Sequence, residues 1–588
     1  MRKRIIIIMF FFAGLLFLVA GRVFYLQVIN SSHSGQELAQ KALKFRSQYL
    51  SAEEYYRGEI LDRNMLSLTD SGIRPTLVAF PGSIKNIDET CEKLEAILEI
   101  PAQESEVKIS RSQEKLGRRT PLILKVNLTS EEVEKYRANK LPGLTVIPIK
   151  TRYGPHSVAK HVVGYVNSIN AQKWQELTQA KKTVETNNFL ATAYRLTDKI
   201  GVAGLEGKHE EVLKGSQPEN RIIGFTDANG RLLEGLGYKI KKEQADAWRN
   251  HLILTIDRKY QEIVERVMDK EIVRGAVVVI DIPTGDVLAL ASRPDFDQNQ
   301  VEKYLGGVDE LLDRTNRVVF YPGSVFKIVV ATGVLEENLV QPGEKLVCTG
   351  TYVFPDKTEI NCLGEHGEIN LQEAIAKSCN TTFIQLGLRL GGTKLLHYAQ
   401  KLGFEIKVNN QSPPALLGNA SLGQQGVLVS PLQIANLYAT IGRGGLYCPW
   451  RLVAQIRNYQ GDIIQEFQPG IPKQVLKPAT CAFLKEALSE ATRVGTGQQA
   501  WLEVIGTAGK TGTAQANKAG KVIAWFAGFT PLENPRLAIV VMVEEQKDDS
   551  RKNLRGGEVA APVFKEIAKE ILTLIEIVNG NIFKYGVE

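Results

Sequence analysis

The pattern of apolar and polar positions first marks a short apolar segment at the start of the chain. Residues 5–21 carry no charge, and the basic residues Arg2, Lys3 and Arg4 precede them. A run of this length is at the short end of the range that spans a membrane as a helix, and the basic residues predict a cytoplasmic N-terminus with the rest of the chain outside. A cleaved signal peptide is the alternative, although the segment lacks a clear cleavage site of small residues.

The next part of the chain, residues 31–250, is polar and rich in Lys and Glu, with only short apolar stretches. This pattern predicts an extended, mixed α/β module. Within it, the charge-rich residues 104–119 are typical of a solvated helix face or loop.

Longer apolar runs follow from about residue 251: residues 276–282, 287–291, 522–529 and 537–543. The first two runs are separated by the turn sequence Pro-Thr-Gly-Asp, which predicts a hairpin. The last two are nearly continuous, as in strands that helices bury on both faces. Residues 561–578 have apolar positions at helical spacing and Pro562 in the first turn, so we expect a helix there.

Composition supports a folded, multidomain protein. The chain has 588 residues, of which 44% are hydrophobic and 23% charged, so wholesale disorder is excluded and two to four domains are expected. A net charge of +7 is too dilute to indicate nucleic-acid binding. We expect an α+β protein with a cytoplasmic tip and transmembrane helix (residues 1–30), an extended α/β pedestal (31–250), an antiparallel sheet covered by helices (251–578) and a tail (579–588).

A serine followed three residues later by a lysine places a hydroxyl and an amine on one helix face, where a neutral amine can take the serine proton. The pattern occurs four times: Ser105/Lys108, Ser112/Lys115, Ser157/Lys160 and Ser324/Lys327. The first two pairs lie in the charged stretch, where a solvated lysine stays protonated. The third pair lies in a polar segment.

Only Ser324 begins a predicted helix whose following turns are apolar. Burial there disfavours the charged form of Lys327, and a helix N-terminus favours negative charge developing at Ser324. The alternative is a capping serine with a lysine that extends its amine to solvent.

Two further motifs follow in the order that this kind of serine acyl transfer requires. In Ser378-Cys379-Asn380, Ser378 can relay a proton to a leaving amine and Asn380 can hydrogen-bond a substrate amide. We expect the Cys379 side chain to point away from its two neighbours and pack.

The third motif is Lys510-Thr511-Gly512-Thr513. Lys510 can hold positive charge near a substrate carboxylate, and Gly512 can let a peptide backbone lie against the strand edge. Thr511 and Thr513 offer hydroxyl donors, and the backbone N–H groups of Ser324 and Thr513 are expected to form an oxyanion hole. A phosphate-binding loop would need glycine at position 504, which is valine, so a nucleotide site is excluded.

With these three motifs the sequence resembles the class B penicillin-binding proteins, the monofunctional, FtsI-like peptidoglycan D,D-transpeptidases. The likeness covers roughly residues 1–575. It extends to segments resembling the family's pedestal and transpeptidase motifs: residues 57–64, 161–166, 204–207, 321–324, 423–426, 430–433 and 560–564. No acidic cluster between residues 28 and 250 resembles a glycosyltransferase domain, so the bifunctional class A enzymes do not fit.

The resemblance implies a serine β-lactamase/transpeptidase-like fold, an acyl-enzyme on Ser324, stem peptides ending in D-Ala-D-Ala as substrate, and β-lactams as inhibitors. Together with the N-terminal apolar segment, these motifs predict a single-pass cell-membrane protein with an extracytoplasmic catalytic domain. The implied partners are a SEDS-type glycan polymerase and division or elongation proteins, with a septal or sporulation-related role. Two alternatives stay open: a β-lactamase or carboxypeptidase on the same fold, and a non-catalytic scaffold or β-lactam sensor.

The cysteines and histidines predict no metal or cofactor, because no His-Glu-x-x-His arrangement is present and Cys91, Cys448 and Cys481 lack metal-ligand spacing. Cys348 and Cys362 bracket a turn-rich segment, and similar paired cysteines occur in some relatives. A disulfide between them, closing a loop worth about 3 kcal/mol, is favoured over two buried thiols.

Overall fold

The computed structural model describes residues 2–25, 47–116, 121–169, 172–176, 194, 198–225, 233, 238–243, 246–307, 309–341, 343–515, 522–545 and 554–578. These residues form two compact units, each built from separate stretches of chain. The smaller unit takes residues 1–56, 71–155 and 216–246, and the larger takes residues 57–70, 156–215 and 247–588. The predicted tail, residues 579–588, lies outside the described residues.

The first apolar segment forms helix α1 (Arg2–Phe24). Within the described residues, no helix meets the combined length and hydropathy needed to cross a membrane. The transmembrane helix therefore stays a prediction.

The other described residues of the smaller unit form two three-stranded antiparallel sheets and three α-helices. One sheet has the order β1 (Ser47–Ser51), β8 (Asn220–Phe225), β9 (Tyr238–Lys242). The other has the order β4 (Leu122–Lys125), β3 (Gly72–Ala79), β5 (Leu144–Thr151). The turn η2 (Pro81–Ser83) and helices α3 (Ile87–Leu98), α4 (Ala102–Leu116) and α5 (Ser130–Ala138) complete it.

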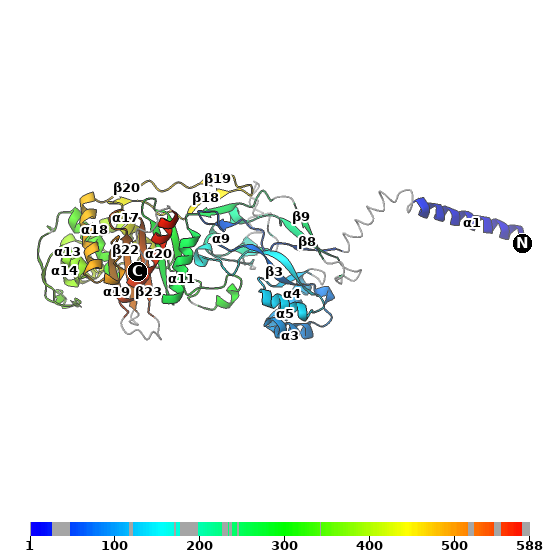
Figure 1. Ribbon diagram of the computed structural model, residues 1–588, viewed down its shortest axis with the longest axis horizontal. Helices are drawn as coiled ribbons and strands as arrows, with labels where there is room; N and C mark the ends of the chain where they lie inside the picture. Colours follow the sequence, from blue (N-terminus) through cyan, green and yellow to red (C-terminus); the bar gives the residue numbers. More distant parts are fainter. Residues whose placement is uncertain are drawn as a thin grey trace. The chain divides into compact units, whose positions relative to one another are not determined.

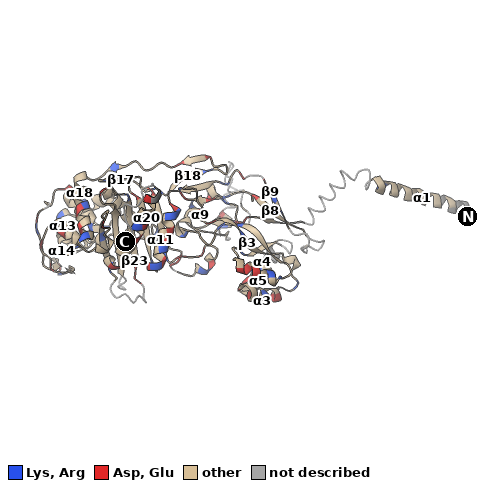
Figure 2. Cartoon of the chain, in the orientation of Figure 1, with Lys and Arg blue, Asp and Glu red and all other residues tan. Residues whose placement is uncertain are grey.

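The charge-rich stretch in this unit forms most of helix α4, as the sequence predicted for a solvated helix face. Figure 2 shows acidic and basic residues mixed over α3, α4 and α5. Exposed pairs one turn apart link Glu89 to Lys93 and Glu104 to Lys108. Such pairs stabilise a helix by only a few tenths of a kcal/mol each, so this face is a solvated surface.

The larger unit is built on a five-stranded sheet in which neighbours are antiparallel, and this confirms the predicted sheet and hairpin. Its order is β12 (Val287–Arg293), β11 (Gly275–Asp281), β23 (Leu537–Glu544), β22 (Val522–Thr530), β21 (Ala508–Gln515). Alternate residues of a strand face opposite sides, yet nearly all of β22 and β23 is buried, so both faces must be covered.

Helices cover both faces of this sheet. On one face α11 (Arg258–Glu271) and the predicted C-terminal helix α20 (Ala561–Val578) lie side by side and share a core with Val277 and Ile539 (Figure 1). The alternate residues, such as Val278 and Val540, are buried on the other face, where α17 (Pro431–Gly442) packs. The apolar runs are continuous because each strand is enclosed on two sides.

A second sheet of this unit joins residues from distant parts of the sequence. Its order is β19 (Ile463–Glu466), β18 (Val453–Arg457), β10 (His251–Leu254), β2 (Ile60–Leu61). The smaller elements are β6 (Val166–Ser168), β7 (Lys199–Gly201), α6 (Lys160–Val163), α9 (Gly204–Lys208), α10 (Glu210–Leu213) and η4 (Val301–Tyr304). Two motifs of the family resemblance meet here, because Arg57 Nε donates to Glu206 Oε2 over 2.8 Å with both side chains buried.

The remaining elements of the larger unit include those that carry the first two motifs of the candidate site. They are η5 (Gly323–Phe326), α12 (Lys327–Glu336), β13 (Leu346–Cys348), β14 (Thr351–Val353), β15 (Glu359–Asn361), β16 (Gly367–Ile369), α13 (Leu371–Ala376), α14 (Asn380–Leu390), α15 (Gly392–Lys401), α16 (Pro414–Ser421), β17 (Leu446–Tyr447), β20 (Lys473–Gln474), α18 (Pro478–Arg493), η6 (Gln498–Ala500) and α19 (Gly556–Val559).

Candidate active site

Ser324 and Lys327 lie at the junction of η5 and α12. Residues three apart in a 3-10 turn lie above one another, so the two side chains share a face. Ser324 is half-buried, whereas Lys327 is fully buried. The helix that follows is apolar and buried over residues 328–331, as the sequence pattern predicted.

The Lys327 amine is the link between the first and second motifs. Its Nζ donates to the Ser378 carbonyl oxygen at 2.8 Å, to Asn380 Oδ1 at 2.7 Å and, more weakly, to Ser378 Oγ at 3.4 Å. Burial lowers the pKa of Lys327 to about 7, while the nearby thiols of Cys362 and Cys379 act to raise it. An amine with such a pKa is partly neutral near pH 7 and can accept a proton.

The second motif lies on a strained turn before α14. Ser378 is buried and has φ +56°. Few residues other than glycine adopt this left-handed backbone conformation. Asn380 begins α14, and its Nδ2 donates to the Asn361 carbonyl oxygen at 2.8 Å. The turn therefore presents the Ser378 carbonyl and hydroxyl and the Asn380 amide together to Lys327.

The third motif is on β21, the outermost strand of the five-stranded sheet as described. Lys510 is fully buried, and burial together with repulsion from Lys327 holds its pKa well below the usual lysine value. Thr511 is buried and its Oγ1 lies 2.6 Å from Thr496 Oγ1, whereas Thr513 is exposed. The structure thus places two buried lysines close enough for their charges to interact.

Gly512 packs in a way the sequence did not predict. A Cβ there would lie 2.8 Å from the Pro322 carbonyl oxygen and 3.2 Å from Trp525 Cβ. The face of β21 toward which a Gly512 side chain would point is thus covered by the chain segment that carries Ser324. From the other side, a Cβ on Gly323, which has φ +56°, would lie 2.7 Å from the Thr513 carbonyl oxygen. Two glycines therefore allow η5 to lie against β21.

Replacing Gly512 with alanine is expected to cost about 1–3 kcal/mol of unfolding free energy, because the atom in the way belongs to backbone and cannot rotate aside. The melting temperature should fall by several degrees. The added methyl group should also displace Ser324 and slow its acylation. The matched control is Gly343→Ala, at a glycine with nothing within 4 Å of the added Cβ. Equal melting temperatures and acylation rates for both variants would contradict this packing.

The other serine–lysine pairs lack this arrangement where the structure describes them. Lys108 binds Glu104 at 2.8 Å, and Lys160 binds Asp295 at 2.6 Å. Each of these amines is thus paired with a carboxylate, whereas the Lys327 amine donates to neutral oxygens. The side chains of Ser112 and Lys115 lie outside the described residues.

Three cysteines and a histidine converge beside the second motif, and sequence analysis missed this. The six cysteines of the chain are free thiols, so the disulfide between Cys348 and Cys362 is not formed in this structure. Instead, both sulfurs lie 3.5 Å from Nδ1 of His366, and Cys362 Sγ lies 3.7 Å from Cys379 Sγ. The one available sequence signal was the spacing of Cys362 and His366, four residues apart.

Two models of known protein families match this chain. The model of the penicillin-binding protein transpeptidase domain matches residues 275–569, and that of the penicillin-binding protein dimerisation domain matches residues 53–245. A crystal structure of the D,D-transpeptidase domain of a peptidoglycan glycosyltransferase from Eggerthella lenta has the same fold, with a TM-score of 0.51 and 22% identity over 60% of this chain and 96% of that chain.

Similar curated proteins include Stage V sporulation protein D of Bacillus subtilis, 28% identical over 97% of this chain and 85% of its own length. Peptidoglycan D,D-transpeptidase MrdA of Acinetobacter baumannii is 27% identical over 94% of this chain and 86% of its own length. Peptidoglycan D,D-transpeptidase FtsI of Escherichia coli K12 is 26% identical over 95% and 89%. The chain belongs to the class B penicillin-binding proteins, and its five-stranded sheet lies in the family's transpeptidase domain.

Proposed function

We propose that this chain cross-links the stem peptides of peptidoglycan through an acyl-enzyme on Ser324. The reaction is that of a serine-type D,D-transpeptidase. Ser324 Oγ attacks the carbonyl carbon between the two D-alanines of a stem, the terminal D-alanine leaves, and an amine of a second stem takes the acyl group. The observation that carries this proposal is the fully buried Lys327 amine, which lies three residues after Ser324 and donates hydrogen bonds to three neutral oxygens of Ser378 and Asn380.

In this proposal Lys327 is the general base. Its amine is desolvated and has a pKa of about 7, so it can take the Ser324 proton as the C–O bond forms. Ser378 Oγ, 3.4 Å from that amine, passes the proton on to the nitrogen of the leaving D-alanine. The Asn380 side chain fixes Lys327 through Oδ1 and can hydrogen-bond the amide of the stem.

The edge of β21 is the proposed binding surface for the stem. An extended peptide can add to an unpaired strand edge through backbone hydrogen bonds, and Thr511 and Thr513 can contribute hydroxyls. The carboxylate of the terminal D-alanine would balance the positive charge of the buried Lys510 amine and so raise its lowered pKa. The backbone N–H groups of Ser324 and Thr513 are the proposed oxyanion hole. β-Lactams are inhibitors in this scheme because they acylate the same serine.

We further propose that residues 5–21 anchor the chain in the cell membrane as a single span, with the chain that follows them outside the cytoplasm. The uncharged run after three basic residues supports this orientation. The similarity to Stage V sporulation protein D supports a septal or sporulation-related role. A membrane-embedded SEDS-type polymerase is the partner that would supply glycan strands to a monofunctional transpeptidase.

The partition of the acyl group between an amine and water tests this function. The full chain is incubated with a stem peptide ending in D-Ala-D-Ala and with increasing concentrations of an acceptor amine. We expect D-alanine release with an amide product whose share rises with acceptor concentration. Release with only the hydrolysed acid would instead indicate a carboxypeptidase. Rapid loss of a penicillin adduct would indicate a β-lactamase, and no release by a folded chain would indicate a scaffold.

A further inference from the structure

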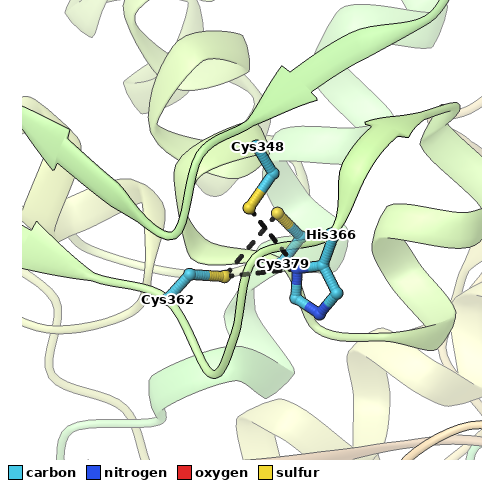
Figure 3. Close-up of side chains that lie close together, drawn as sticks. All are labelled: Cys348, Cys362, His366 and Cys379. Carbon is cyan, nitrogen blue, oxygen red and sulfur yellow. Dashed lines mark hydrogen bonds between the residues drawn. The ribbon is translucent and has the colours of Figure 1, made fainter.

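Cys348, Cys362, His366 and Cys379 form a compact set of metal-ligating side chains in the larger unit. Figure 3 shows the three sulfurs and the imidazole ring pointing toward one another. Their ligand atoms, three Sγ and one nitrogen, all lie within 4.8 Å of one another. Cys348 and Cys379 are fully buried, and the other two residues are half-buried.

Three of the six separations among these atoms match a tetrahedral site, and the other three are at most 4.8 Å. With Zn–S bonds of about 2.3 Å and a Zn–N bond of about 2.05 Å, tetrahedral geometry places two sulfurs about 3.8 Å apart and a sulfur and a nitrogen about 3.6 Å apart. The observed separations are 3.7 Å between the Cys362 and Cys379 sulfurs and 3.5 Å from each of Cys348 and Cys362 to His366 Nδ1. These contacts therefore need little rearrangement to surround one ion.

The local fold brings the four residues together from separate elements. The register of β13 with β16 pairs Cys348 with Gly367 and so places it beside His366. Cys362 follows β15, whose hairpin with β14 is continued by a hydrogen bond from the Cys362 N–H to the Gly350 carbonyl oxygen at 2.8 Å. Cys379 is the residue before α14. Isolated two-stranded sheets are only marginally stable, so a metal ion that links these two strand pairs would stabilise them.

From these contacts we propose that Cys348, Cys362, His366 and Cys379 bind one Zn²⁺ ion. Three thiolates and one imidazole in a tetrahedral set are ligands that zinc prefers. Each thiol loses its proton to solvent when its sulfur binds the ion. With four protein ligands the coordination is complete, so the site is structural, and no open position remains for a substrate or a reactive water.

Hydrogen bonds into Cys362 support this assignment. The backbone N–H of Asn380 donates to Cys362 Sγ at 3.1 Å, an arrangement that favours a thiolate. The Cys362 sulfur thus already accepts a hydrogen bond from a backbone N–H, the kind of outer contact that supports a metal-bound thiolate.

The zinc site would position part of the active site. Asn380 is held by its backbone to Cys362 Sγ and by its Nδ2 to the Asn361 carbonyl oxygen, and its Oδ1 accepts from Lys327. Cys379 lies directly between Ser378 and Asn380. A bound ion would therefore fix both polar residues of the second motif relative to Lys327. This consequence rests on the proposed function, whereas zinc binding itself does not.

Zinc content per chain is the test. The purified full chain is reduced, stripped with a chelator, desalted, supplied with Zn²⁺ alone, desalted again and measured by elemental analysis. The same is done for His366→Gln and Cys362→Ser, and for the matched controls His397→Gln, an exposed histidine, and Cys481→Ser, a buried cysteine outside the cluster. Cobalt replaces zinc in a parallel sample as a spectroscopic probe.

We expect one zinc per chain in the parent and in both controls, near none in the two cluster variants, and a sulfur-to-cobalt charge-transfer band that the cluster variants lack. Acylation by penicillin should fall about 10- to 100-fold in His366→Gln, as for other groups that orient a site. Folded, reduced parent without zinc would overturn the proposal, as would equal zinc in all variants. A Cys348–Cys362 cross-linked peptide in the chain as first isolated would also overturn it. None of these zinc results depends on whether the chain is a transpeptidase.

Discussion

Penicillin is expected to add once to the parent chain and not at all to Ser324→Ala. Ser324 is half-buried at the start of an apolar helix, with the buried base Lys327 three residues later on the same face of the 3-10 turn. Removing Oγ removes the atom that would form the ester and leaves the surrounding packing in place. The intact mass of the chain after exposure to penicillin measures the adduct.

The control for this result is Ser105→Ala, in the first of the other serine–lysine pairs. Ser105 is buried, but its neighbour Lys108 is held by Glu104. This variant should take up penicillin as the parent does. A normal adduct on Ser324→Ala, or loss of the adduct from Ser105→Ala with its fold intact, would contradict the assignment.

Replacing Lys327 with methionine is expected to slow acylation by about 10²- to 10⁴-fold, the usual contribution of a general base. Methionine fills a similar volume without a proton-accepting amine. In the parent, the acylation rate should rise about tenfold per pH unit below the Lys327 pKa of about 7 and level off above it, because only the neutral amine accepts a proton. In Lys327→Met this rise should be absent. Stopped-flow acylation between pH 5 and 9 measures both effects.

Lys160→Met is the matched control, since Lys160 follows Ser157 by three residues but is paired with Asp295. It should keep the parent's rate and pH profile. Methionine leaves the Ser378 carbonyl oxygen and Asn380 Oδ1 without their hydrogen-bond donor, which lowers the stability of the fold. Circular dichroism therefore checks that Lys327→Met is folded. A folded Lys327→Met chain with the parent's pH profile would exclude Lys327 as the base.

The features that the sequence predicted are those determined by neighbouring residues. The hairpin of β11 and β12 and the helix α20 could be predicted because continuous apolar runs, a Pro-Thr-Gly-Asp turn and helical spacing are local signals. The apolar turns after Ser324 and the burial of Lys327 follow from the same kind of pattern. Chemistry carried by one short motif is therefore visible without a structure.

What the sequence did not predict depends on contacts between distant segments. Position 512 needs a glycine because Pro322, which is 190 residues earlier, lies against it. The four residues of the cysteine–histidine set come together only when two hairpins and the start of α14 fold against one another. Their sequence separations do not follow a common zinc pattern, so the first interpretation of Cys348 and Cys362 was a disulfide.

Peptide mapping of the penicilloyl group tests directly whether Ser324 is the nucleophile. The parent chain is acylated, digested at low pH and analysed by tandem mass spectrometry. We expect the added mass on Ser324 and on no other residue. Because Lys327 contacts Ser378 Oγ, Ser378 is the informative alternative nucleophile. An adduct on Ser378, or no adduct on a folded chain, would contradict the assignment of Ser324 as the nucleophile.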